Sequence, residues 1–317
     1  MDKNLHVITV ISNPVRYKSR YDLYNKFAKH VEDSGAILIT AEMAYGDRDF
    51  AITEPGNPYH LQLRSRHELW HKENMMNLAL ARLPADAEYI AWIDADITFS
   101  RPDWVSETVE LLQHYDVIQM FEYATDLGPN FEPLKTHKSF VSQWCESESG
   151  LDRNQEYHAW HPGYAWAARR EAIDRLGGFF DEAILGSGDR HMACSLIGDV
   201  SASFYPDMDN CCPELKSHLL AYQHRANKYI NRNIGFMPGT ILHHWHGKKK
   251  DRGYSDRWKN LTDNKFNPVT DIYRDTQGLY QLTDEKPRLR DGIRRYFRSR
   301  NEDSQDLQIY RVGLPTL

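Results

Sequence analysis

The segment Tyr89–Phe99 constrains the fold of this chain more than any other. It begins with the apolar and aromatic run Tyr-Ile-Ala-Trp-Ile and leads directly into Asp94-Ala95-Asp96. A continuous apolar run of this length is typical of a fully buried strand in a parallel sheet. Asp94 and Asp96 then lie at the carboxyl end of that strand, where open α/β sheets bind their ligands. The segment therefore predicts an α/β fold with a binding site at this edge.

The spacing of Asp94 and Asp96 suits a divalent cation. Mg²⁺ and Mn²⁺ prefer oxygen ligands, and they bind through few protein groups when they also hold phosphate oxygens. A strand that ends in a solvated Asp-rich turn has the same local sequence. The interpretation as a metal site therefore depends on the buried run before the pair and on motifs elsewhere in the chain.

The length and composition favour one domain with a C-terminal extension. The chain has 317 residues, which is long for one core and short for two full domains. We expect an α/β domain over residues 1–256 and a C-terminal extension over 257–317 that packs on it and ends in a weakly structured tail. The net charge of −6 argues against a general nucleic-acid-binding surface. No apolar stretch approaches the ~18 residues of a membrane span, and the four cysteines form no disulfide framework. A cytoplasmic location is the expectation.

Strand and helix patterns alternate along the chain. Besides the segment before Asp94, strands are expected at residues 5–11, 36–40, 61–67, 116–121 and 239–245. Helical spacing is found at residues 21–31, 70–80, 104–115, 170–176, 190–197 and 288–300. Residues 122–155 contain prolines and scattered aromatics, and they are expected to form a long substrate-facing loop.

Four motifs then occur in order along the chain, and together they carry a family resemblance. They are the cations Arg16, Lys18 and Arg20 after the first strand, Trp70-x-Lys72-Glu73-x-x-x-Asn77, Trp92-Ile93-Asp94-x-Asp96, and His243-x-Trp245-His246-Gly247. In this order the chain resembles the metal-dependent GT-A glycosyltransferases, and in particular bacterial and phage proteins with these motifs. It is more distantly similar to the β-1,4-galactosyltransferases. The resemblance covers roughly residues 7–256 and implies a Rossmann-like GT-A fold, with a mostly parallel central sheet flanked by helices.

The resemblance implies a metal site. Asp96 is implied as a direct ligand of Mn²⁺ or Mg²⁺, and Asp94 faces the ribose or a metal-bound water. His246 is implied as the last ligand, with His243 three residues earlier as a further candidate. Strand alternation instead puts His244 and His246 on one face and His243 on the other. Both arguments include His246, and the choice between the other two histidines stays open at this point.

The resemblance also implies a nucleotide site and a catalytic base. Arg20, together with Arg16, is placed at the nucleotide, and Lys72 lies over the ribose and diphosphate. A cation there neutralises the charge that develops on the departing diphosphate. Asp189 occupies the position of the general base of an inverting transfer, which must reach the acceptor hydroxyl, although an Asp there is also a common helix N-cap. The family usually has Glu-Asp here and this chain has Gly188-Asp189, so the acceptor-orienting Glu is missing.

We therefore expect a hexosyl- or pentosyltransferase that moves a sugar from a nucleoside-diphosphate sugar, with a UDP-sugar as the first candidate, to an acceptor hydroxyl. The expected acceptor is a glycan or lipid-linked glycan. A modified DNA base is the second candidate, because such enzymes occur in phages and the basic segment 288–300 would suit a phosphate backbone.

Three other interpretations fit parts of the sequence. The run Asp94-Ala95-Asp96-Ile97-Thr98 fits the signature of haloacid-dehalogenase-type phosphatases, in which the first Asp is a nucleophile; that fold normally carries it on the first strand. A non-catalytic nucleotide-sugar-binding module would share the fold. A metal hydrolase built on His244 and His246 lacks a third ligand at a short fixed spacing.

Overall fold

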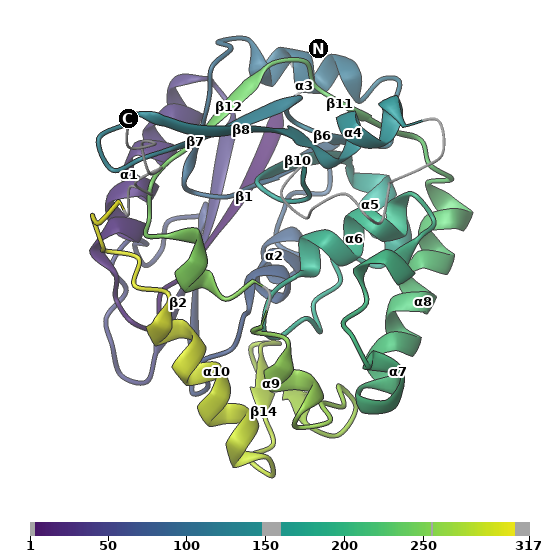
Figure 1. Ribbon diagram of the computed structural model, residues 1–317. Helices are drawn as coiled ribbons and strands as arrows, with labels where there is room; N and C mark the ends of the chain where they lie inside the picture. Colours follow the sequence, from purple (N-terminus) through teal and green to yellow (C-terminus); the bar gives the residue numbers. More distant parts are fainter. Residues whose placement is uncertain (1–3, 148–159, 255, 308–317) are drawn as a thin grey trace, which may run out of the picture.

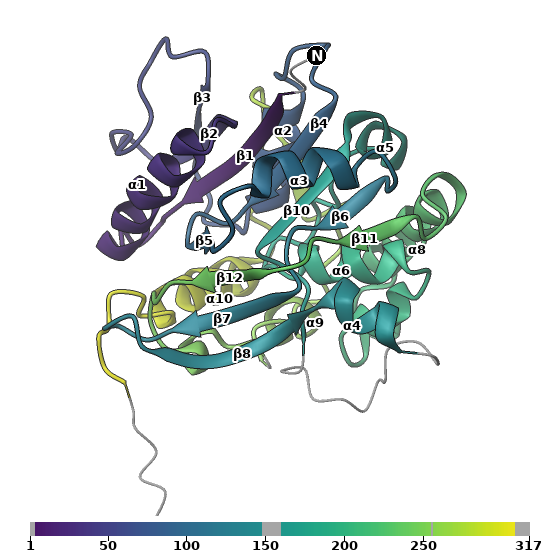
Figure 2. The same cartoon turned by 90° about the horizontal axis from the view of Figure 1, so that it is seen from above.

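The central element of the protein is a mixed sheet. The computed structural model describes residues 4–147, 160–254 and 256–307. Within them, seven strands form this sheet in the order β11-β6-β10-β4-β1-β2-β3 (Figure 1; the order can be followed by the labels in Figure 2). Neighbouring strands are parallel except where β10 pairs with β4 and β6. The strands are β1 Leu5–Ser12, β2 Ile37–Tyr45, β3 His60–Ser65, β4 Tyr89–Ile93, β6 Val117–Gln119, β10 Ala165–Arg169 and β11 Ile234–Phe236.

Helices cover both faces of this sheet because its strands carry apolar side chains on both sides. Along β1, Val7 and Ile8 point to opposite faces and belong to separate hydrophobic clusters. One face packs against α1 (Lys18–Asp33) and α3 (Trp104–Leu111) (Figure 2). The other packs against α2 Lys72–Leu80, α5 Arg170–Leu176, α6 Gly188–Leu196 and α8 Pro213–Tyr229. The predicted fold class, an α/β fold with a mostly parallel central sheet flanked by helices, is confirmed.

The strand β4 is the buried strand expected before the two aspartates, and all five of its residues are buried. The chain then turns through Asp94-Ala95-Asp96 and enters β5 (Ile97–Phe99), which belongs to a second sheet. In the described residues this sheet has the order β5-β12-β7-β8-β9. Its other strands are β12 Thr240–His243, β7 Tyr123–Leu127, β8 Pro133–Ser139 and β9 Trp160–His161. The two aspartates therefore lie where the two sheets meet.

The expectation of an irregular loop over residues 122–155 is wrong for the part that the structure describes. That part contains β7, β8 and α4 (Phe140–Glu146), while residues 148–155 lie outside the described residues. β7 and β8 are only partly buried, so they lack the continuous apolar run that marks β4. Pro133 stands at the first position of its strand, where proline is tolerated. The strand expected at 239–245 is also shorter, because it ends at His243.

The C-terminal segment packs across the cavity end of the domain. Its elements are η2 Lys249–Arg252, α9 Lys259–Thr262, β13 Ile272–Arg274, β14 Tyr280–Leu282 and α10 Pro287–Ser299 (green to yellow in Figure 1). The Asp303 carboxylate accepts hydrogen bonds from the backbone N–H groups of Lys18 (3.0 Å) and Ser19 (2.8 Å). It thereby caps α1, whose own N-cap residue makes no side-chain capping bond.

Two short helices, η1 (Val200–Ser203) and α7 (Met208–Cys211), complete the elements. The predicted division at residue 256 stays a prediction, and the tail over 308–317 lies outside the described residues. Among the helices of the described part of the chain, none combines the length and apolarity that a bilayer crossing requires.

Candidate functional site

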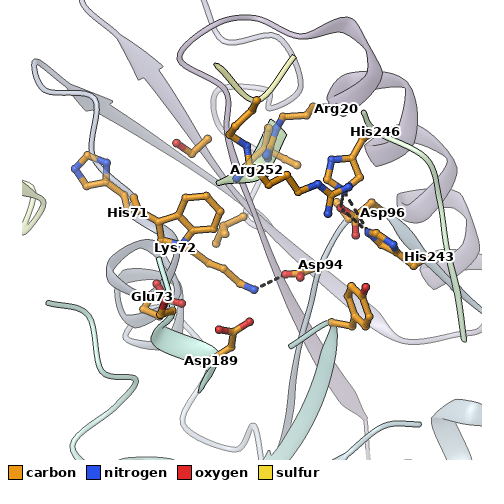
Figure 3. Close-up of a pocket in the computed structure, with 18 of the residues that line it drawn as sticks. Arg20, His71, Lys72, Glu73, Asp94, Asp96, Asp189, His243, His246 and Arg252 are labelled. Atoms are coloured by element: carbon orange, nitrogen blue, oxygen red, sulfur yellow. Dashed lines mark hydrogen bonds and ion pairs between the residues drawn. The ribbon is translucent and has the colours of Figure 1, made fainter. Parts of the chain in front are cut away.

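A cavity opens at the carboxyl ends of β1 and β4, with an empty volume of about 1220 Å³ that includes its solvent-open mouth. The walls come from the end of β1, the first turns of α1, the start of α2, the Asp94–Asp96 turn, the start of α6 and the C-terminal segment. Most of the residues predicted from the sequence line it: Arg20, Lys72, Asp94, Asp96, Asp189, His243 and His246 (Figure 3). Arg16 is exposed in the turn between β1 and α1 and lies outside the lining.

Asp96, His243 and His246 converge at one side of this cavity. Asp96 Oδ2 lies 2.9 Å from His246 Nε2 and 4.0 Å from His243 Nε2, and the two Nε2 atoms are 3.3 Å apart. The other carboxylate oxygen of Asp96 is buried without a hydrogen-bond partner among the described residues. Carboxylate and imidazole groups are metal ligands, and a buried unpaired oxygen requires a partner. This trio therefore fits a divalent cation.

The end of β12 explains why these two histidines meet. The strand stops at His243, so the alternation that would group His244 with His246 does not continue beyond it. The His244 ring instead turns to Thr98, with Nε2 2.8 Å from Oγ1, while its backbone N–H donates to Asp96 O at 2.8 Å. Of the two histidines left open by the sequence, it is His243 that lies with Asp96 and His246.

Each histidine of the trio has a carboxylate behind it. His243 Nδ1 lies 2.8 Å from Asp126 Oδ1, because His243 on β12 is paired in register with Asp126 on the parallel strand β7. His246 Nδ1 lies 3.8 Å from Oε2 of Glu302, which is fully buried. A hydrogen-bonded partner such as Asp126 orients a ligating imidazole and selects its tautomer, whereas Glu302 is too far from His246 Nδ1 for a hydrogen bond and acts on it through its charge. Sequence reasoning misses both: the alternating residues of β7 are a signal for Asp126, whereas no motif marks Glu302.

The charges of the trio suit cation binding. Burial would raise the pKa of Asp96, but the charge of His246 and its hydrogen bond outweigh burial and hold this pKa below its ordinary value. Burial likewise opposes ionisation of Asp126, and the hydrogen bond from His243 holds the pKa of Asp126 below its ordinary value. Burial lowers the pKa of His243 to about 4, so this imidazole is neutral at pH 7. Ionised carboxylates and a neutral imidazole are the forms that bind metals.

The cationic wall of the cavity is built around Glu302. Arg20 donates from Nη2 to Glu302 Oε1 at 2.8 Å, and Arg300 forms an ion pair with the same carboxylate. Burial would raise the pKa of Glu302, but the two guanidinium groups hold it well below its ordinary range. Both arginines also line the cavity, so one carboxylate fixes two cations at its wall. Fixed guanidinium groups suit the recognition of phosphate oxygens.

Lys72 and Asp94 form an ion pair in the middle of the cavity. Lys72 is the first residue of α2, and its Nζ lies 2.5 Å from Asp94 Oδ1 (Figure 3). Burial would lower the pKa of Lys72, but the charge of Asp94 reverses this effect and raises it, with smaller contributions from Asp189 and Glu73. Lys72 is therefore a permanent cation at pH 7. Asp94 lies outside the trio of Asp96 and the two histidines.

Asp189 lies in the first turn of α6, and its Oδ1 accepts a hydrogen bond from the backbone N–H of Arg190 at 2.8 Å. Gly163 makes room for this carboxylate, because a Cβ atom at position 163 would lie 2.4 Å from Asp189 Oδ2. Asp189 thus presents a carboxylate to the same cavity that holds Lys72 and the trio.

No model of a known protein family matches the chain, and the comparison with curated proteins found no match. Among solved structures, S. aureus TarS in complex with UDP-GlcNAc is similar at 10% identity and a TM-score of 0.44, over 93% of this chain and 72% of that one. Drosophila β1,4-galactosyltransferase 7 in complex with manganese, UDP-Gal and xylobiose is similar at 12% identity and a TM-score of 0.32, over 64% of this chain. The chain spans just under two thirds, 63%, of that Drosophila chain. A putative nucleotide-diphospho-sugar transferase from Desulfovibrio desulfuricans has 12% identity and a TM-score of 0.32, over 92% and 97% of the two chains. At these identities the likeness concerns the fold alone.

Proposed function

We propose that this protein is a metal-dependent GT-A glycosyltransferase that moves a sugar from a UDP-sugar to an acceptor hydroxyl with inversion. One observation carries the proposal: three kinds of group line a single cavity at the carboxyl end of a mostly parallel sheet. They are the candidate metal ligands around Asp96, several cationic side chains, and the Asp189 carboxylate, which is not one of the candidate ligands. A nucleoside-diphosphate donor requires these three features together, because its diphosphate leaves with a negative charge while the acceptor loses a proton.

The residues that would hold the cation are Asp96, His243 and His246. Mn²⁺ is our first candidate, because two imidazoles beside one carboxylate suit a transition metal better than Mg²⁺, which prefers oxygen ligands. The same donor set also binds Fe²⁺ and Zn²⁺, so both belong in a metal screen. When bound, the cation neutralises charge on the diphosphate. Asp94, placed outside the trio, would face the ribose or a metal-bound water.

Lys72 and Arg252 would bind the diphosphate oxygens. Arg252 is buried at the cavity wall, and its Nε–H has no hydrogen-bond partner among the described residues. Its guanidinium lies close enough to Asp96 to lower the pKa of that carboxylate, which puts it beside the proposed cation. A buried cation with an unpaired donor is stabilised by an anion. Arg20 stands with Glu302 at the nucleotide end of the cavity, whereas Arg16 lies outside its lining.

Asp189 would act as the base. In the proposed step the acceptor hydroxyl gives its proton to the Asp189 carboxylate, and its oxygen forms a bond to the anomeric carbon of the sugar. The bond from that carbon to the diphosphate oxygen breaks, and UDP leaves with the electron pair. Attack from the side opposite the leaving group inverts the configuration. A glycan or lipid-linked glycan is the first acceptor class, ahead of a modified DNA base.

The phosphatase alternative fits the geometry less well. It requires Asp94 as a free nucleophile, yet this carboxylate is ion-paired with Lys72. It also requires Asp96 as a proton donor, whereas the pKa of Asp96 is held below its ordinary value in the folded protein. A non-catalytic binding module would keep the cation and nucleotide sites and differ only in the absence of turnover.

The test is release of UDP from UDP-Gal, UDP-Glc and UDP-GlcNAc with and without Mn²⁺. We expect Mn²⁺-dependent release from at least one donor, even with water as the acceptor, and none in EDTA. Asp189→Asn should retain Mn²⁺–UDP binding and lose at least about 100-fold in turnover, whereas Asp103→Asn, at an exposed position directly before α3, should match the wild type. Full activity of Asp189→Asn would exclude it as the base. If the wild type hydrolyses an aryl phosphate and Asp94→Asn does not, the protein is a phosphatase with Asp94 as its nucleophile and the proposed transfer is wrong.

A further inference from the structure

Glu73 is a buried carboxyl group that the transfer scheme leaves without a role. It belongs to the first turn of α2 and is only 6% exposed. Together with Asp189 it lines both the main cavity and a smaller recess behind it. Among the described residues, its main electrostatic neighbours are Lys72 and Asp189, and no neighbouring side chain is hydrogen-bonded to its carboxyl group. A buried carboxyl group that faces a cavity with so few partners is stabilised by a ligand that supplies the missing hydrogen bonds.

A glycine makes room for this carboxyl group. A Cβ atom at Gly188 would lie 2.4 Å from both Cδ and Oε1 of Glu73, which excludes any side chain there while Glu73 keeps its place. Gly188 directly precedes Asp189, so the Glu73 carboxyl group lies against the backbone that carries the proposed base. Figure 3 shows the two carboxyl groups on the same side of the Lys72 side chain. Glu73 on α2 and Asp189 on α6 therefore face the same part of the cavity.

The two groups suit different roles. Two neighbouring carboxyl groups do not both ionise readily. Burial raises the pKa of Glu73 to about 8; the charge of Lys72 opposes this shift, and that of Asp189 adds to it. Glu73 is thus a hydrogen-bond donor as well as an acceptor near pH 7, whereas the Asp189 carboxylate accepts a hydrogen bond from the backbone N–H of Arg190.

We infer that Glu73 binds a second hydroxyl of the acceptor, next to the one that transfers its proton to Asp189. The site then selects acceptors with two adjacent hydroxyls, as on a sugar ring. This inference rests on the proposed function. An acceptor with one hydroxyl, such as a serine side chain, a long-chain alcohol or a hydroxymethylated base, leaves the buried Glu73 carboxyl group unpaired. Sites built to bind a hydroxyl strongly reject analogues that lack it.

The experiment measures sugar transfer from the best UDP-sugar with Mn²⁺ to a panel of methyl glycosides and their deoxy analogues. Each analogue lacks one hydroxyl adjacent to the site of transfer. The variants are Glu73→Leu, which removes the polar group at similar size, and Glu73→Gln, which keeps hydrogen-bonding atoms. The control is Glu171→Gln, on the surface of α5, where the carboxylate pairs with Arg175. Thermal melting and the Mn²⁺–UDP dissociation constant establish that each variant is folded and binds the nucleotide.

We expect Glu73→Leu to lower kcat/KM for the glycoside roughly 10- to 100-fold, the loss of one hydrogen bond to a charged or buried partner. The loss should appear as a raised KM for the acceptor, with the Mn²⁺–UDP dissociation constant unchanged. Glu73→Gln should retain most of the transfer. With the deoxy acceptor, the wild type and Glu73→Leu should become similar, because the two changes remove the same interaction and are not additive.

Three results would overturn the inference. The first is an unchanged acceptor KM in Glu73→Leu. The second is equal losses in this variant with the glycoside and its deoxy analogue. The third needs no variant: a wild-type enzyme that uses single-hydroxyl alcohols as well as glycosides. Failure of the wild type to bind Mn²⁺–UDP would instead refute the proposed function, and this inference with it.

Discussion

Replacing Asp126 with asparagine should weaken metal binding without removing a ligand. Asp126 is buried on β7, and its Oδ1 lies 2.8 Å from His243 Nδ1. This carboxylate keeps the imidazole proton on Nδ1, so that Nε2 faces Asp96 and His246 with a free lone pair. Asparagine has nearly the same shape, but its amide can donate to Nδ1. The proton then moves to Nε2 and blocks the metal-binding atom.

The magnitude follows from what the change leaves intact. All three ligands remain, and the Tyr164 hydroxyl, 3.3 Å from Asp126 Oδ1, can still donate to the asparagine oxygen. The change therefore removes only the carboxylate that hydrogen-bonds the ligand His243. Removing such a partner typically weakens metal affinity by roughly 10- to 100-fold, or about 1.4–2.8 kcal/mol. Lys249, which pairs with Asp126, would lose its counter-charge and add repulsion to an incoming cation.

Mn²⁺ affinity can be measured by electron paramagnetic resonance of the free ion, at a pH near 7 and without nucleotide. The matched control is Asp103→Asn, whose exposed carboxylate pairs with Arg101 on the protein surface. A Mn²⁺ dissociation constant of Asp126→Asn within about threefold of the wild type would refute the reasoning. The melting temperature without metal shows whether the variant is folded.

Three further perturbations test separate parts of the account. The contribution of Glu73 to the free energy of unfolding should fall as the pH rises from about 4.5 toward 8, because its folded-state pKa of about 8 lies above its unfolded value; relative to the wild type, Glu73→Gln should therefore shift the slope of the unfolding free energy against pH upward by as much as about 1.4 kcal/mol per pH unit in this range, and an unchanged slope in urea unfolding would contradict it. Gly178→Ala should destabilise the fold by about 1–3 kcal/mol, because φ is +88° and the new Cβ would lie 2.5 Å from Asn77 Oδ1; wild-type stability in chemical denaturation would show that the backbone relaxes. Lys72→Met should weaken Mn²⁺–UDP binding in calorimetry roughly tenfold or more while Mn²⁺ alone binds as before, and equal losses for both would indicate that Lys72 acts through Asp94.

Local patterns predict the parts of this fold that depend on short stretches of chain. The apolar run before Asp94 forms a buried strand, and α5 ends at Gly177, which adopts the left-handed conformation. The pair Asp94 and Asp96 does lie at the carboxyl edge of the sheet. The two residues nevertheless separate, because the chain changes sheets between them: one pairs with Lys72 and the other faces the histidines.

Local patterns do not predict the contacts between segments that are distant in the sequence. His243 lies with Asp96 because β12 ends there, and the length of a strand depends on its neighbours rather than on its own alternation. Asp126 meets His243 through the pairing of two strands more than a hundred residues apart in the chain. Glu302 is buried among arginines that only the folded C-terminal segment brings together. Glu73 was part of a recognised motif, but its approach to the start of α6 required the packing of two helices.

The most direct measurement of the central claim is a crystal structure with Mn²⁺ and UDP, with diffraction data collected at the manganese absorption edge. The account predicts one anomalous peak bound by Asp96, His243 and His246, with diphosphate oxygens completing its coordination and Lys72 beside them. An absent peak, a peak at other residues, or UDP bound away from the peak would contradict the assignment of this cavity as a nucleotide-sugar site.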